Sequence, residues 1–382
     1  MADFSFKVSP NILLGSYAST RVGQTLLSYG TKFMVVLDPI LRENGIAQKL
    51  MKALDDKKID YFVFDELSKG GESEALGRCL KLCREAHIHG VIAMGGGKPL
   101  SIGRAVCSLF NEEKDLYDYL DGLEPKSTPL PFIAIPTTIR DHFVFTDFVP
   151  LVDARSSTLK ILKAQSGIAK LVLFDPILTS TLTENQLDSM ALETLCVATE
   201  SYLSQRENFF SNMIAEKSIE LLTCALDGSQ SLTVITPREE LLSQGGCMAS
   251  LSVSTSSIGI ASLLAICINA RYKISRSLVT TILFPYIIEE CAKFKADKIA
   301  FLAKKMGLAQ AEQTNEEAAH AFAENIRQRI AKANLPARLK DLSISLEQLA
   351  LAAEDAGQLD FVNSLPRSMN SDDLFGIIKT AY

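Results

Sequence analysis

Three consecutive glycines, Gly95 to Gly97, follow the apolar run Val91 to Met94 in the stretch VIAMGGGKPLSIGRAV. Glycine has no Cβ, so the backbone can turn sharply there and bring its N–H groups close to a ligand. The residues after the glycines are patterned as a helix, whose positive N-terminal end attracts anions. The stretch therefore predicts a phosphate site. An ordinary tight turn between strand and helix is the alternative, because GGGKP matches neither GxGxxG nor GxxxxGK[ST].

Other polar residues also follow apolar runs. Asp38 comes directly after FMVVL, and Thr137 and Thr138 come after FIAIP. Ligands of parallel α/β sheets bind beyond the carboxyl ends of the strands. We therefore expect these three side chains to lie at the same edge of a sheet as the glycines.

The elements that would position these residues alternate along the first half of the chain. Runs typical of buried strands are 33–37, 61–64, 91–94, 132–135 and 171–174, and helix-patterned segments are 20–29, 42–56, 72–87 and 99–111. This alternation is typical of βαβ units. It predicts a Rossmann-like, doubly wound parallel sheet.

After Thr183 the strand signals end and the period becomes helical. Thr183 and Gln186 form a capping-box pattern that predicts the start of a helix running to Leu203. Further helices are expected at 207–227, 237–269, 277–293, 296–306, 314–333 and 346–356. The sequence thus predicts two domains, an α/β nucleotide-binding domain at 1–178 and an all-helical domain at 179–382.

The composition excludes several classes of partner. The 382 residues carry 39 basic and 45 acidic side chains, a net charge of −6, and no basic cluster that would neutralise a nucleic-acid backbone. No apolar run reaches the roughly 20 residues that span a bilayer, and MADFSFKVSP lacks the pattern of a secretory leader. We expect a cytoplasmic protein with no nucleic-acid or membrane partner.

Eight cysteines are present, inside helical patterns, which favours free thiols over disulfides. Cys79, Cys83 and His87 have i, i+4, i+8 spacing on one predicted helix and could hold a metal. The alternative is a helix face packed on the sheet, because Leu76 and Leu80 make the same segment apolar.

The order of these pieces resembles the iron-containing alcohol dehydrogenase family, with the dehydroquinate synthase-like fold. VIAMGGGKPLSIGRA is similar to the family's glycine motif GGGS-P-x-D-x-A-K, and FIAIPTT to its IPTT motif. LVLFDPILTSTLTENQLDSMALETLCVATESYLS resembles the segment leading to the family's metal helix, and ARYKISRSLVTTILFPYI the segment with its last metal histidine. The resemblance covers almost the whole chain.

The resemblance implies oxidation of small alcohols or reduction of aldehydes with NAD(P). The residues that would hold the dinucleotide are Asp38, Gly95, Gly96, Gly97, Lys98, Thr137, Thr138 and Lys160. Asp38 would bind the adenine ribose and disfavour a 2′-phosphate, which favours NAD over NADP. Lys160 would reach the nicotinamide side, or else be a solvated charge at a strand end.

The family binds a divalent metal, which polarises the alcohol oxygen. This sequence does not carry the residues that bind that metal in the family. Its ligand positions carry Glu193, Val197, Ser262 and Arg276, where the family has one acid and three histidines. Valine cannot bind a metal, and arginine repels a cation. The chain has four histidines, His87, His89, His142 and His320, so a three-histidine site cannot be built in the helical half.

Further substitutions flank the expected cofactor groove. Ser101 and Arg104 replace the family's aspartate and lysine, and Arg140, His142 and Phe143 stand where the family has small residues. These bulky residues would narrow the groove. Arg140 could clamp a phosphate, or form a surface ion pair.

Glu193 and Arg276 suggest two hypotheses for the altered metal position. They could form a structural ion pair that compensates a buried carboxylate. Alternatively, Arg276 could polarise a substrate carbonyl or bind a carboxylate, with Cys196 or His142 as proton donor.

Three functions follow from the resemblance. The first is an NAD(P)-dependent oxidoreductase of a small alcohol or aldehyde with a degenerate metal site. The second is a non-catalytic descendant that binds a nucleotide or a phosphorylated metabolite. The third, a lyase like dehydroquinate synthase, fails because it needs metal histidines. The strand-like segment FSFKV near the N-terminus favours a homodimer through edge pairing.

Overall fold

The computed structural model describes residues 10–67, 71–228 and 236–382. The chain divides into two compact units between Thr181 and Leu182. We describe each unit by itself. The strand-like segment at residues 4–8 lies outside the described residues.

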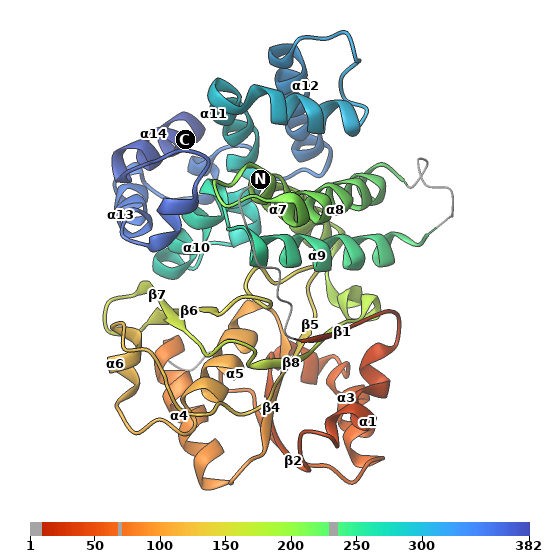
Figure 1. Cartoon of the computed structure of the whole chain (residues 1–382), viewed down its shortest axis with the longest axis vertical. Helices are drawn as coiled ribbons and strands as arrows, with labels where there is room; N and C mark the ends of the chain where they lie inside the picture. Colours follow the sequence, from red (N-terminus) through yellow and green to blue (C-terminus); the bar gives the residue numbers. More distant parts are fainter. Residues whose placement is uncertain (1–9, 68–70, 229–235) are drawn as a thin grey trace. The chain divides into compact units, whose positions relative to one another are not determined.

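A sheet of six parallel strands forms the first unit, in the order β1-β8-β5-β4-β2-β3 (Figure 1). Its strands are β1 (Asn11–Leu14), β2 (Lys32–Leu37), β3 (Asp60–Phe64), β4 (Gly90–Gly95), β5 (Phe132–Pro136) and β8 (Ala169–Phe174). Five of them contain the apolar runs that we interpret as strands. The predicted parallel sheet is therefore confirmed.

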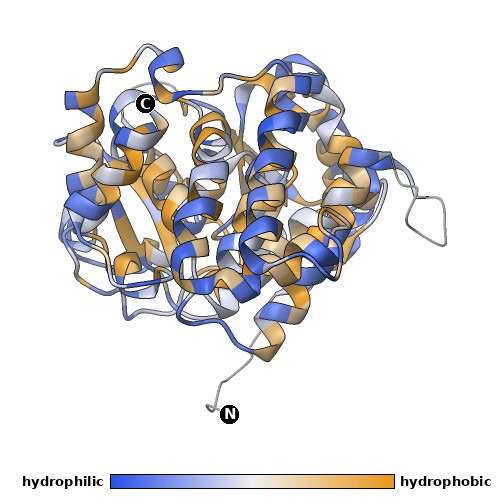
Figure 2. Cartoon of the chain, turned by 90° about the horizontal axis from the view of Figure 1, so that it is seen from above, coloured by the Kyte–Doolittle hydropathy of each residue, from blue (hydrophilic) through white to orange (hydrophobic). Residues whose placement is uncertain are grey.

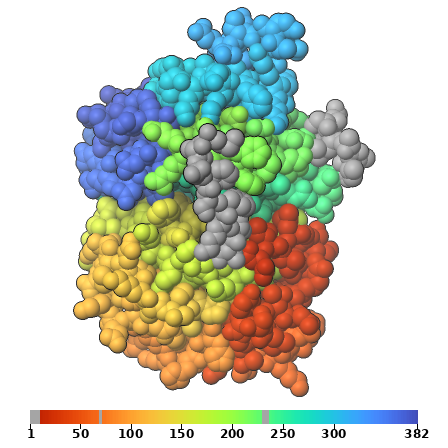
Figure 3. Space-filling model, in the orientation of Figure 1, coloured from red at the N-terminus to blue at the C-terminus, as the bar shows by residue number. Residues whose placement is uncertain are grey.

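Helices cover both faces of this sheet. They are α1 (Val22–Leu26), α2 (Pro39–Glu43), α3 (Ala47–Asp55), α4 (Glu72–Glu85), α5 (Gly97–Leu109) and α6 (Leu116–Leu120), with the 3-10 helices η1 (Ala18–Arg21) and η2 (Pro176–Thr181). In the space-filling view, the atoms of this unit, coloured red to yellow-green, form one continuous block (Figure 3).

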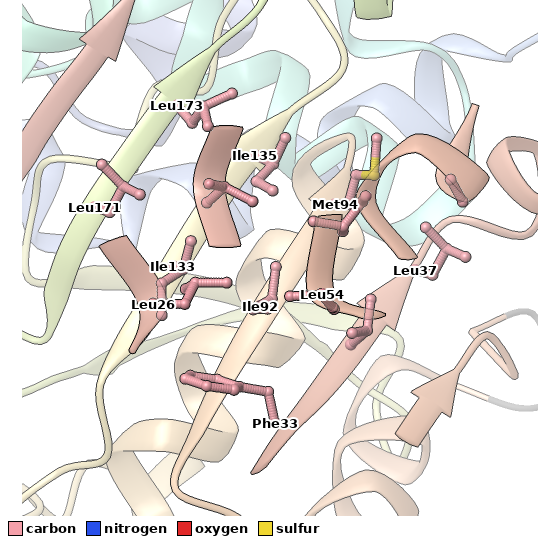
Figure 4. Packing of buried hydrophobic residues seen from close by; sticks show 14 of the residues in the cluster. Leu26, Phe33, Leu37, Leu54, Ile92, Met94, Ile133, Ile135, Leu171 and Leu173 are labelled. Carbon is pink, nitrogen blue, oxygen red and sulfur yellow. The ribbon is translucent and has the colours of Figure 1, made fainter. Parts of the chain in front are cut away.

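Alternate residues of each strand point to opposite faces. Ile92 and Met94 of β4 join a buried cluster with Leu26 of α1 and Leu54 of α3 (Figure 4). On the other face, α5 approaches the sheet at Gly103, where an added Cβ would lie 2.8 Å from Ala93 Cβ. A side chain at residue 103 would therefore push α5 away from β4.

The strand order places a switch point beside β2. The chain passes from β2 to the edge strand β3 and then places β4 on the opposite side of β2. The connections thus diverge beyond the carboxyl ends of β2 and β4, which is where open α/β sheets bind ligands. Asp38 follows β2 directly, and Gly96 follows β4.

One hairpin of this unit differs from our prediction, because we did not interpret its segments as strands. β6 (Phe148–Asp153) and β7 (Thr158–Lys163) pair antiparallel in a separate two-stranded sheet. Pro150 lies within β6, and proline within an apolar run argues against a strand unless the strand lies at an edge. In a two-stranded sheet both strands are edges.

The second unit is helical in all its described regular elements. They are α7 (Glu184–Leu203), α8 (Phe209–Asp227), α9 (Arg238–Thr255), α10 (Ile260–Tyr272), α11 (Arg276–Lys305), α12 (Asn315–Lys332), α13 (Leu346–Gly357) and α14 (Ser371–Ala381), with the 3-10 helices η3 (Leu339–Leu342) and η4 (Asp360–Ser364). Hydrophilic and hydrophobic residues alternate along many of the helices (Figure 2). The predicted α/β-then-helical order is confirmed.

The capping box predicted for α7 is present. Gln186 N–H donates to Thr183 Oγ1 at 3.3 Å, and Thr183 N–H donates to Gln186 Oε1 at 2.9 Å. Two helix N-terminal donors are thereby satisfied. α7 then continues to Leu203, as the sequence predicts.

The single helix predicted at 237–269 is wrong. The segment forms α9 and α10, which are bent by 98° relative to each other. Gly259 begins the second helix as its N-cap, and glycine is poorly suited to a helix interior. No single helix in the described ranges is long and apolar enough to cross a membrane, although α9 and α10 together reach that length and composition.

Candidate functional site

The glycine stretch forms a sharp connection between β4 and α5. Gly95 has φ +148°, and an added Cβ would lie 2.5 Å from Pro99 Cγ and 2.8 Å from Asp38 Cβ. Any side chain at Gly95 would be strained and would clash. Gly96 is the N-cap and Gly97 the first residue of α5. The turn thus places the start of a 13-residue helix at the switch point.

The start of α5 offers hydrogen-bond donors to an anion. N–H groups in the first turn of a helix have no partner within the helix. Pro99 contributes no N–H, so Gly97 and Lys98 supply the donors nearest the end of the helix. Lys98 is half-buried and carries a positive charge beside them. This arrangement fits a phosphate group by both hydrogen bonding and charge.

Asp38 lies beside the glycine turn. Its carboxylate accepts hydrogen bonds from the backbone N–H groups of Gly96 and Ile40. Burial raises the pKa of Asp38, while these two hydrogen bonds and the charge of Lys98 act in the opposite direction. A half-buried acceptor at this place is suited to the hydroxyl groups of a ribose.

Thr137 and Thr138 reach the same edge from β5. The Thr137 N–H donates to Gly95 O at 3.0 Å. Thr138 Cγ2 is 3.8 Å from the position that a Cβ of Gly96 would take, and Thr138 Oγ1 donates to Arg140 O at 2.8 Å. The structure thus brings together the strand-end residues that the sequence singled out.

The segment after Thr138 is buried. Arg140, Asp141 and His142 are 6%, 9% and 5% exposed. Asp141 Oδ1 accepts a hydrogen bond from Phe143 N–H at 2.9 Å, which fixes a local turn. Arg140 is therefore not a surface residue. That it clamps a phosphate stays a prediction.

Lys160 lies on β7 in a network of charged groups. Its Nζ is 3.5 Å from Asp121 Oδ1, and Arg155 Nη2 contacts the same carboxylate at 2.8 Å. Lys160 thus carries a partly exposed charge paired with an acid of the same unit. Its predicted role at the nicotinamide stays a prediction.

Three of the predicted catalytic or ligand positions lie on α7. Glu193, Cys196 and Val197 are 0%, 0% and 1% exposed. Burial, with the carboxylates of Glu200 and Glu193 nearby, raises the pKa of the Cys196 thiol well above its usual range. The thiol stays protonated at neutral pH. Such a weak acid is a poor proton donor.

Ser262 is engaged by a carboxylate that our sequence reasoning did not single out. Ser262 Oγ donates to Glu200 Oε2 at 2.6 Å, and the backbone N–H of Ala261 donates to Glu200 Oε1 at 2.6 Å. Glu200 thereby caps the N-terminus of α10 from a neighbouring helix. An added Cβ at Gly259 would lie 2.5 Å from Glu200 Cβ, so glycine is needed there.

Arg276 is the first residue of α11 and is half-buried. The ion pair that we expect between Arg276 and Glu193 stays a prediction. The face of α11 toward α7 carries other residues: Ser189 Oγ donates to Ser277 Oγ at 3.3 Å, and Thr281 Oγ1 donates to Ser189 O. Arg276 precedes Ser277 and so projects about 100° away around the helix.

The residues at the four positions predicted for the metal do not fit the family's metal. Val197 has no ligand atom, the Ser262 hydroxyl bonds to Glu200, and Arg276 is a cation. Among residues 10–67, 71–228 and 236–382, no group of three or more His, Cys, Asp or Glu side chains could hold a metal ion. Cys79 and Cys83 are buried with their sulfurs 4.0 Å apart, whereas His87 is exposed beyond the end of α4.

Glu200 gives the helical unit a pH-dependent stability. Burial raises its pKa to about 7, against four opposing hydrogen bonds. Because the folded pKa exceeds the unfolded value, the folded state keeps the proton between about pH 4.5 and pH 7, and stability falls across this window as pH rises. We expect a loss of about 3 kcal/mol. Urea unfolding at pH 5 and pH 8 should show this loss in the wild type and a smaller one in Glu200→Gln. Equal losses of stability in the wild type and Glu200→Gln would show that Glu200 does not cause the pH dependence.

Comparison with known proteins gives matches along the chain. Residues 9–176 match the family described as "Iron-containing alcohol dehydrogenase", and residues 189–382 match "Fe-containing alcohol dehydrogenase family, C-terminal". The chain is 23% identical to 1,3-propanediol dehydrogenase of Citrobacter freundii over 378 residues, which are 98% of this chain and 97% of that protein. It is also 23% identical to the NADPH-dependent butanol dehydrogenase of Clostridium saccharobutylicum, over 92% of each chain.

Solved structures agree in fold. The crystal structure of a 1,3-propanediol oxidoreductase superimposes with a TM-score of 0.91 over 100% of both chains at 22% sequence identity. A sulfoacetaldehyde reductase from Bifidobacterium kashiwanohense, solved in complex with NAD⁺, gives a TM-score of 0.84 at 18% identity, with 100% of this chain and 99% of that chain covered.

Proposed function

This chain belongs to the iron-containing alcohol dehydrogenase family, and on that premise we propose that it transfers hydride between NAD(H) and a small alcohol or aldehyde. The observation that carries the proposal is the convergence of Asp38, Gly96 and the start of α5 at the switch point of the sheet. A dinucleotide needs an anion site and a ribose acceptor side by side, and these residues supply both.

Different residues would bind different parts of the dinucleotide. The N–H groups of Gly97 and Lys98 would donate to the pyrophosphate, with the Lys98 charge beside it. Asp38 would accept from the ribose hydroxyls. Its carboxylate would repel a 2′-phosphate, which supports NAD over NADP, although one relative is named NADPH-dependent. The bound nicotinamide would supply the hydride chemistry.

The polar groups proposed for the substrate are Glu193, Arg276, His142 and Cys196. Reduction of an aldehyde also requires a proton for the carbonyl oxygen. The raised pKa of Cys196 makes it the weaker proton donor, so we assign that role to His142. Arg276 carries a charge suited to polarising a carbonyl or binding a carboxylate. No step is assigned to a metal, because the ligand positions do not fit one.

The lack of suitable metal ligands at these positions favours a second function. A family member without metal ligands is suited to binding a nucleotide or phosphorylated metabolite without turnover. Assays of NADH oxidation with a panel of small aldehydes, in the presence of a chelator, separate the two. Turnover that survives the chelator supports the oxidoreductase. Saturable NADH binding without turnover of any aldehyde supports the binding protein.

A further inference from the structure

One arginine of the α/β unit holds the segment that follows the IPTT motif. Arg104 lies two turns into α5 and is 3% exposed. Its Nη1 donates to the carbonyl oxygens of Phe143 and Thr146, and its Nη2 donates to Phe148 O at 2.8 Å. A single side chain thus satisfies three backbone acceptors in a six-residue stretch.

That stretch belongs to a long connection between two strands. Between β5 and β6 the chain runs for eleven residues, 137–147, with no helix or strand of its own. Its internal bonds are short-range: Phe143 N–H donates to Asp141 Oδ1, and Thr146 Oγ1 donates to Phe143 O at 2.9 Å. The two ends of the segment are bonded to the unit, because Thr137 N–H donates to Gly95 O at 3.0 Å and Ala164 N–H donates to Asp147 O at 2.8 Å. Between these ends, Arg104 connects the segment to α5.

The chemistry of this connection requires a guanidinium. Its planar fork presents donors in fixed directions and reaches several carbonyls at once, whereas a lysine ammonium is a compact point donor. Burial lowers the pKa of Arg104 to about 10, partly offset by the charges of Asp141 and Asp147, so it stays charged at neutral pH. The cation is held by carbonyl dipoles and nearby carboxylates together.

The same helix that carries Arg104 begins at the glycine turn. The segment starts with Thr138, whose Cγ2 lies beside Gly96, and continues to Arg140 and His142. We propose that Arg104 is a positioning residue that fixes the 138–148 segment at the glycine turn and thereby sets the affinity of the site for the dinucleotide. This inference rests on the proposed function, since Arg104 acts there through other residues.

The unit offers a matched control at the opposite end of α5. Arg84 also donates to three backbone carbonyls, those of Leu109, Phe110 and Glu112, at 2.7–2.9 Å. It holds the C-terminal end of the helix, away from the glycine turn. Arg84→Met and Arg104→Met therefore remove similar sets of bonds, and only the second should alter the ligand site.

The test combines NADH titration with hydrogen–deuterium exchange of the complete chain. Arg104→Met should weaken NADH binding about tenfold or more and speed amide exchange at residues 139–148. Arg84→Met should speed exchange near residues 109–113 and leave NADH affinity unchanged. Arg104→Lys should weaken NADH binding by a smaller factor. It serves as the test variant if the methionine variant does not fold.

The outcomes separate this proposal from the proposed function. If the wild type binds NADH, equal affinities in the wild type and Arg104→Met overturn the proposal. If the wild type binds no NADH, the proposed function fails, and exchange alone decides on Arg104. Faster exchange confined to 139–148 then supports its positioning of the segment. Unchanged exchange in that segment overturns it.

Discussion

A Gly96→Asp variant is expected to bind NADH at least about a hundredfold more weakly than the wild type while keeping its fold. Gly96 is the N-cap of α5 with φ −81° and ψ −163°, a conformation that aspartate adopts readily at this position. An added Cβ would meet no atom closer than 3.8 Å, so the substitution fits without clash.

The loss arises from charge and competition. The aspartate side chain would accept the N–H of Lys98, one of the two donors that we assign to the pyrophosphate, and would place a negative charge beside it. Losing hydrogen bonds to a charged group costs about 1.5–3 kcal/mol, which corresponds to roughly ten- to a hundredfold in affinity before repulsion is added. Repulsion from Asp38 offsets part of the stability that the new cap provides.

Gly96→Ser is the matched control for this experiment. Serine caps the helix without charge, so its thermal unfolding should resemble that of the aspartate variant while its NADH affinity should fall far less. Fluorescence titration with NADH and thermal unfolding by circular dichroism give the two readouts. Equal NADH affinities in the two variants would mean that the pyrophosphate does not lie at the start of α5.

The second large effect concerns metal. Purified wild-type protein is expected to retain no stoichiometric iron or zinc after dialysis, because Val197, Ser262 and Arg276 cannot supply the three missing ligands. Elemental analysis measures this directly. A triple variant with histidine at these three positions, next to the native Glu193, provides the comparison, and its absorption spectrum with Co²⁺ reports coordination.

A metal retained by the wild-type protein would contradict this expectation. One equivalent of iron or zinc retained by the wild type, and lost in Glu193→Ala, would show that the helical unit still binds a metal. The metal would then be bound by a ligand set other than one acid and three histidines. Enzyme activity is not needed to read either outcome.

The sheet could be predicted from sequence because its four inner strands, β2, β4, β5 and β8, are largely buried on both faces. Runs such as FMVVL and VIAM contain no polar residue, and short continuous apolar runs separated by helical patterns are typical of parallel sheets. We did not predict the hairpin β6–β7, because Pro150 and the lysines of TLKILK are typical of a loop. The strand-end residues followed from the sheet, since its topology brings them to one edge.

The polar contacts in the interior could not be predicted. Glu200 lies in a helical segment, where an acidic residue is usually exposed. Its role depends on the start of α10, 60 residues later, and the sequence alone does not show that this helix start lies beside Glu200. Arg104 is similar: its three partners are carbonyl oxygens of a loop, which leave no side-chain signal. Both roles depend on where the fold places backbone donors and acceptors, which the residue type alone does not show.

The central claim is that the α/β unit binds NAD(H) at the glycine turn. Titration of the wild-type protein with NADH, followed by the nicotinamide fluorescence in the presence of a chelator, tests it most directly. The account predicts saturable binding with a dissociation constant below about 1 mM, and weaker binding of NADPH. Absence of saturable NADH binding up to that concentration would contradict it.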